Sequence, residues 1–130
     1  MGADSNFIVG WCGMLAGVMS GTVLGLYFHQ EEWQGGYGSF RRRLIRLGHI
    51  SFIGLGTINV LFALSARASA SAAPSLFSQI ASVALNVGAV TMPICCFLTA
   101  WRTSLRRFFA VPVAAEFVGI LAFIVGWLRQ

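Results

Sequence analysis

Four long apolar runs, separated by short polar stretches, make up most of this chain. The runs cover residues 7–29, 44–66, 76–101 and 108–128, and each has about the 20 residues that a helix needs to cross a bilayer core. In lipid, every backbone N–H and C=O must be hydrogen-bonded within the protein, which favours helices. The pattern predicts an all-α polytopic membrane protein, with residues 1–130 as one domain of four transmembrane helices in an up-down bundle.

The residues between the runs indicate where helices begin and bend. Ser39 is expected to cap the second helix. Pro74 and Ser75 mark the start of the third. Pro93 lies inside the third run and should bend its helix.

Glycine recurs at every fourth position in the first run, at Gly13, Gly17, Gly21 and Gly25. On a helix, these positions form one slowly drifting stripe. In water each such glycine would cost about 1 kcal/mol relative to alanine, but in a membrane the missing side chains leave a groove for a neighbouring helix. We expect the stripe to pack closely against another helix, with other membrane subunits or self-association as the implied partners.

Composition and charge support the same class of protein. The chain is 57% hydrophobic and 10% charged, whereas soluble domains carry about 25% charged residues. Its net charge of +5 comes from arginine alone, concentrated in the loops after the first and third runs. The positive-inside rule then places both termini on the non-cytoplasmic side. We expect a protein of the bacterial inner membrane, surrounded by the lipid bilayer and without a nucleic-acid partner.

Two histidines suggest a cofactor site near the cytoplasmic face. His29 ends the first run and His49 lies early in the second, so a bis-histidine b-type haem is one hypothesis. Arg42 and Arg46 would neutralise the haem propionates. The stretch 41–49, followed by an apolar helix, resembles the arginine-flanked haem helices of small membrane cytochromes. The alternative is that both histidines bond loops or lipid headgroups and hold no cofactor.

Three polar side chains in the predicted spans are candidates for a functional role. Glu116 is expected either to pair with Arg106 or Arg107 or to handle protons, because an intramembrane carboxylate is costly and tends to face protein or water. Asn59 and Asn86 are expected at similar depths, where their amides would hydrogen-bond each other and hold the helices together. The alternative is that they line a substrate path.

Known catalytic motifs are missing from the sequence. It has no nucleotide-binding Gly-x-x-x-x-Gly-Lys, no His-Glu-x-x-His and no Gly-x-Ser-x-Gly. Cys12, Cys95 and Cys96 lie in apolar segments and are expected to be buried free thiols. We therefore expect no metal site and no independent catalytic activity.

Taken together, these features favour a small integral subunit of a larger membrane complex, of the kind that serves bacterial respiratory or photosynthetic electron transfer. A small transporter or channel that uses Glu116, Asn59 and Asn86 is the first alternative. A structural or assembly subunit without a cofactor is the second.

Overall fold

The computed structural model describes residues 3–69 and 75–129, which form helices and turns without a strand. Its long helices are α1 (Ala3–Tyr27), α2 (Phe40–Ala68), α3 (Leu76–Trp101) and α4 (Ala110–Leu128), and two loops contain the 3-10 helices η1 (Trp33–Gly35) and η2 (Thr103–Phe109). Four helical segments, the last being η2 with α4, are long and apolar enough to cross a membrane. The prediction of an all-helical chain with four such helices is confirmed.

The helix boundaries follow local capping and burial. Helix α2 begins four residues before the apolar run at 44, and the predicted Ser39 cap is confirmed, because the Ser39 side chain accepts a hydrogen bond from the backbone N–H of Arg42 at 3.1 Å. Ser75 caps α3 in the same way, with Ser78 N–H as donor at 3.2 Å. Pro74 lies outside the described residues, and α3 continues as one helix through Pro93.

Both ends of α1 and the start of α4 also differ from the prediction. Helix α1 starts at Ala3 and not at residue 7, because Asn6 is fully buried among the other helices and belongs to the folded bundle. It ends at Tyr27, so His29 lies in the following turn. Residues 108 and 109 belong to η2, and α4 starts directly afterwards.

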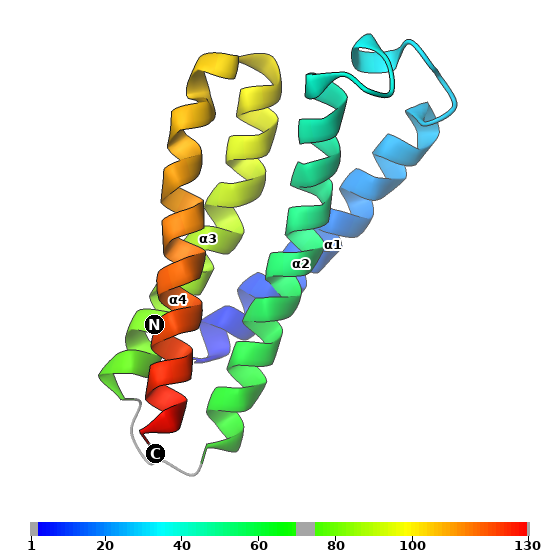
Figure 1. Cartoon of the computed structure of the whole chain (residues 1–130). Coiled ribbons are helices and arrows are strands. Elements are labelled where there is room, and N and C mark those ends of the chain that lie inside the picture. Colours follow the sequence, from blue (N-terminus) through cyan, green and yellow to red (C-terminus); the bar gives the residue numbers. More distant parts are fainter. Residues whose placement is uncertain (1–2, 70–74, 130) are drawn as a thin grey trace.

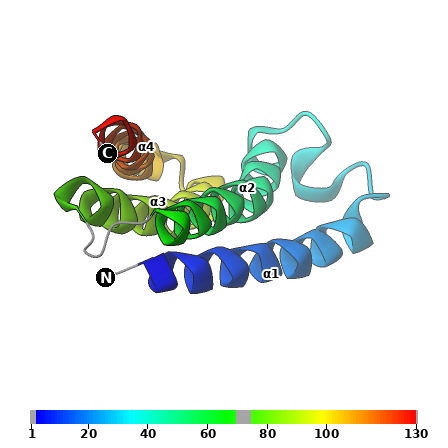
Figure 2. The same cartoon turned by 90° about the horizontal axis from the view of Figure 1, so that it is seen from below.

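Helices α2 and α3 form a central layer, with α1 on one side of it and α4 on the other (Figure 2). Helix α1 crosses α2 obliquely, whereas α4 runs alongside α3 (Figure 1). One apolar cluster joins α2, α3 and α4, and a second joins the start of α2 to the end of α3. The first consists of Phe62, Ala81, Leu85 and Ala122, and the second of Leu44, Ile45 and Ala100.

The glycine-rich face of α1 lies against α2 of the same chain. Backbones come closest at Gly10 and Gly56: a Cβ on Gly10 would lie 2.6 Å from the Gly56 carbonyl oxygen, and a Cβ on Gly56 would lie 2.7 Å from the Gly10 oxygen. No atom of another helix comes within 4 Å of the Cβ position of Gly25. The α1 glycines that meet α2 are Gly10, Gly13, Gly17 and Gly21.

Candidate functional site

Glu116 places a carboxyl group between α4 and α3. The residue is buried, and both carboxyl oxygens are inaccessible and have no hydrogen-bond partner within residues 3–69 and 75–129. The carboxyl rests on the backbone of α3 at Gly88, where an added Cβ would overlap Oε1. A glycine at position 88 therefore makes the space that the carboxyl occupies.

The expected pairing of Glu116 with Arg106 or Arg107 is not what the structure shows. Both arginines are exposed in η2, and the guanidinium of Arg107 lies over the ring of Phe108, with 5.4 Å to its centroid. Glu116 instead faces α3 in the interior of the helix pair, away from the loop. Its carboxyl is thus packed as a polar group in apolar surroundings, without a neutralising cation among the described residues.

A second polar group joins α1, α2 and α3. The Asn6 amide nitrogen donates to Asn59 Oδ1 at 2.7 Å and to the backbone oxygen of Ser82 at 3.0 Å, while Ser82 Oγ donates to Asn6 Oδ1 at 2.5 Å. Asn59 donates to the backbone oxygens of Leu55 and Leu85 at 3.0 and 3.2 Å. Asn6 and Asn59 are both 0% exposed, so these bonds are made inside the protein.

The expected hydrogen bond between Asn59 and Asn86 does not form. The Asn86 amide nitrogen donates to Ser5 Oγ on α1 at 3.2 Å, and its Oδ1 is buried without a partner in the described part of the chain. Gly88 follows Asn86 by two residues and so lies on the opposite side of α3. The contacts therefore do not bring Glu116, Asn59 and Asn86 to one shared path.

Arg42 holds the loop between α1 and α2. Its guanidinium is 2% exposed and donates to three backbone oxygens, those of Phe28 at 3.0 Å and of Gln30 and Glu31 at 3.2 Å each. These carbonyls follow the end of α1, where helix carbonyls lack internal partners and favour a cation. The rings of Phe28, Trp33 and Tyr37 lie 5.1 to 5.7 Å from the same guanidinium.

Arg46 also contacts this loop. Its guanidinium donates to the backbone oxygen of Tyr37 at 3.3 Å and lies over the Tyr37 ring, with 4.5 Å to the centroid. The two arginines that were assigned to haem propionates thus both contact protein groups in the loop after α1.

The two histidines lie in different surroundings. His49 packs against Gly21 of α1, with its Cε1 nearest to the Cβ position of that glycine, and its Nδ1 is 3.1 Å from Ser20 Oγ. His29 is exposed in the turn after α1, eight positions beyond Gly21. The six helical steps from Gly21 to Tyr27 correspond to about 9 Å of axial rise, and no contact joins the two imidazoles in the described part. A haem between them stays a prediction.

The remaining candidate ligands are dispersed. No group of three or more His, Cys, Asp or Glu side chains that could hold a metal ion occurs among the described residues. All three cysteines are free, and they differ from the expectation of common burial: Cys12 is exposed, Cys95 is half-buried and Cys96 is buried.

Sequence reasoning missed Asn6 and Gly88. Asn6 precedes the first apolar run and was assigned to the tail, although an Asp4 in the first helical turn is a typical start signal for a helix that includes it. For Gly88, no sequence signal links it to a carboxyl 28 positions later. Comparison with protein-family models, curated proteins and solved structures gives no match for this chain.

Proposed function

We propose that this chain is a small integral membrane subunit of a larger assembly, in which Glu116 binds and releases a proton. Its helices would form four spans in an up-down arrangement, since the ribbon reverses direction between consecutive helices (Figure 1). Both termini would then face the non-cytoplasmic side, as the arginine-rich loops favour.

The observation that carries the proposal is the buried carboxyl of Glu116 without a partner. An ionised carboxylate in apolar surroundings is costly unless it is paired, so this site favours the neutral acid. The other carboxylates of the described chain are exposed: Asp4 pairs with Arg67 at 2.6 Å, and Glu31 and Glu32 lie in the loop after α1. Glu116 is therefore the carboxyl that a protonation change would affect most inside the bundle.

The surrounding contacts favour one proton-binding group over a complete transport pathway. Asn59 has its amide donors and its oxygen bonded to protein groups, and it lies on the α1 and α2 side of α3. Glu116 lies on the α4 side. A proton path across the membrane would need further polar groups near Glu116. In this proposal, a neighbouring subunit of the assembly provides those groups.

An electron-transfer role with haem between His29 and His49 is a separate hypothesis and does not support the role of Glu116. The Ser20 contact at His49 Nδ1 leaves Nε2 as the nitrogen for another ligand. The exposed position of His29 and the loop contacts of Arg42 and Arg46 give that hypothesis no further support.

Infrared spectroscopy of the purified protein in lipid nanodiscs tests the protonation of Glu116. We expect a carboxylic-acid C=O band at neutral pH that disappears in Glu116→Gln and shifts in Gly88→Ala, since the added methyl group displaces the carboxyl. The band should decline as pH is raised while the helix content stays constant, which shows that the proton is released. Asp4→Asn is the control, because Asp4 is exposed and ion-paired, and it should leave the band unchanged.

Two results contradict the proposed function. In one, wild type and Glu116→Gln have the same spectrum in the carboxylic-acid region. In the other, the band persists until the protein unfolds, so that Glu116 never releases its proton and has only a structural role.

A further inference from the structure

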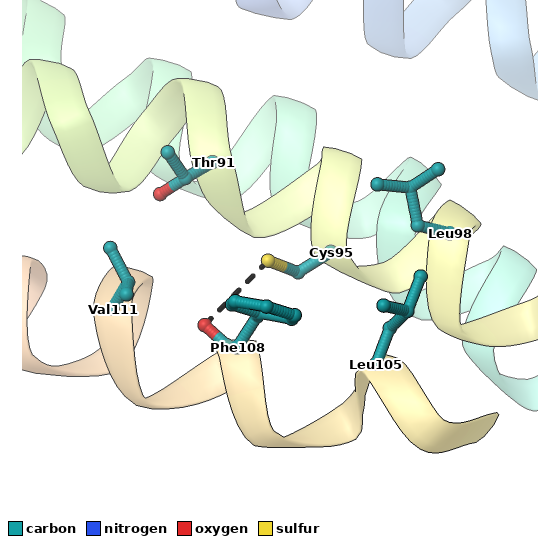
Figure 3. Close-up of a pocket in the computed structure, with 6 residues that line it drawn as sticks. All are labelled: Thr91, Cys95, Leu98, Leu105, Phe108 and Val111. Atoms are coloured by element: carbon teal, nitrogen blue, oxygen red, sulfur yellow. Dashed lines mark hydrogen bonds between the residues drawn. The ribbon is translucent and has the colours of Figure 1, made fainter. Parts of the chain in front are cut away.

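A pocket lies where α3 meets η2 and the start of α4 (Figure 3). It is partly open and has a volume of about 350 Å³. This volume falls at the lower end of the range of about 300–1,000 Å³ found for ligand pockets. Its lining is almost wholly apolar. The lining residues are Thr91, Cys95, Leu98, Leu105, Phe108 and Val111.

The sequence builds this pocket from two regular faces. Thr91, Cys95 and Leu98 are spaced four and three residues apart and share one face of α3. Leu105 and Phe108 are three residues apart and share one face of the 3-10 helix η2. Figure 3 shows these two faces opposite each other, with Cys95 Sγ pointing to the backbone oxygen of Phe108 at 3.8 Å.

The residues that line the pocket on α3 extend along that helix. From Thr91 to Leu98 the helix rises about 10 Å, and the end at Leu98 and Leu105 adjoins the loop that carries the arginines. Because α3 is a predicted span, this row of lining residues follows the direction of lipid acyl chains. An apolar slot with this direction suits a hydrocarbon chain that enters from the interface.

Charge at the loop end determines which lipid fits. Arg107 lies over the ring of Phe108, which lines the pocket, and Arg106 beside it is exposed. The single ion pair of the described chain joins Asp4 and Arg67, so no described carboxylate neutralises either η2 arginine. A phosphate group binds guanidinium groups strongly through charge-assisted hydrogen bonds, and basic sites between helices favour anionic headgroups.

We propose that this pocket binds one acyl chain of an anionic glycerophospholipid, with the lipid phosphate held by Arg107 and Arg106. The pocket selects by two separate features: the apolar slot requires a hydrocarbon chain, and the arginines require a negative headgroup. A soluble glycerol phosphate satisfies the second feature alone and therefore binds much more weakly than the lipid.

Native mass spectrometry of the full chain tests this proposal. The protein is equilibrated in detergent with equal amounts of phosphatidylglycerol and phosphatidylcholine, and the lipid that remains bound is counted. We expect wild type to retain one phosphatidylglycerol in preference to phosphatidylcholine by about tenfold, the factor that corresponds to one charge-assisted contact. Excess glycerol phosphate should not displace it.

Two kinds of variant separate the headgroup from the chain. Arg107→Gln should remove the preference for the anionic lipid. Arg43→Gln should keep it, because Arg43 is an exposed arginine near the start of α2 and does not line the pocket. Thr91→Leu fills the slot and should lower retention of both lipids. Val90→Leu is the matched control, since Val90 is exposed beside the pocket and does not line it.

Equal retention of the two lipids by wild type would show annular lipid alone and overturn the proposal. It is also overturned if Arg107→Gln keeps the preference, if Thr91→Leu retains as much lipid as Val90→Leu, or if glycerol phosphate competes as well as the lipid does. Thermal unfolding of each variant in the same detergent identifies a fold defect, and Cys95→Leu then replaces Thr91→Leu as the slot-filling change.

Discussion

Asn6 connects three helices through one side chain. Its amide nitrogen serves both Asn59 on α2 and the Ser82 backbone on α3, and its oxygen accepts from the Ser82 hydroxyl. Interhelical hydrogen bonds in membranes contribute about 0.6 kcal/mol on average. The position matters more than this average suggests, because each of the partners of Asn6 is buried and has no access to water.

We predict that Asn6→Leu lowers the free energy of unfolding by about 1–3 kcal/mol, since it leaves the buried Asn59 Oδ1 and Ser82 Oγ without their partner. The measurement is equilibrium unfolding in mixed micelles, followed by circular dichroism. Thr22→Val is the control, because Thr22 donates to the backbone oxygen of Val18 on its own helix at 3.0 Å and is exposed. An effect of Asn6→Leu no larger than that of the control would show that the network does not stabilise the fold.

At the scale of helices, the close approach of α1 and α2 depends on where glycines meet backbone. Gly10 and Gly56 face each other so closely that neither position has room for a Cβ without movement of the opposite backbone. Gly25 also lies on α1, yet no atom of another helix lies within 4 Å of its Cβ position. The same residue type on one helix thus has two different roles.

We predict opposite effects for one substitution at these two sites. Gly10→Ala should destabilise the protein by about 1–3 kcal/mol, because the added methyl group overpacks a backbone contact. Gly25→Ala should be neutral, or stabilising by up to about 1 kcal/mol, because alanine has the higher helix propensity. Thermal unfolding in the same detergent compares them, and equal shifts for the two variants would contradict the importance of the Gly10–Gly56 contact.

Local patterns and long-range contacts differ in how well the sequence predicts them. The four helices and the Ser39 and Ser75 caps could be predicted, because apolar length and capping are properties of neighbouring residues. The packing of the Glu116 carboxyl against Gly88 could not, because it depends on which face of α4 meets α3. The role of Arg42 was missed for the same reason: its three carbonyl partners come from the end of another helix.

At the scale of the whole molecule, the helices form an open layered arrangement around α2 and α3 (Figure 2). Helix α4 contacts α3 along its length and reaches α2 where Phe123 meets Phe62, with 5.7 Å between ring centroids. Large apolar side chains cover the outer faces of α1 and α4. These faces suit contact with lipid and with other membrane subunits, as the proposed function requires.

We predict that the tagged chain, extracted from its native membrane with a mild detergent, migrates on a blue-native gel well above the position of the same chain produced alone in a foreign host. The reason is that partner subunits cover part of the outer faces in the native assembly. The chain produced alone is the control for bound detergent and lipid. Identical migration of the two samples would contradict the assignment to a larger assembly.

The bonds of Asn6 also bear on the order in which this protein can be built during synthesis. The first helix enters the membrane with an amide whose partners belong to helices that the ribosome has not yet made. That amide obtains its partner on α2 first and its partner on α3 afterwards. The last helix carries no member of this set, so the bonds of Asn6 can form among the first three helices without the fourth.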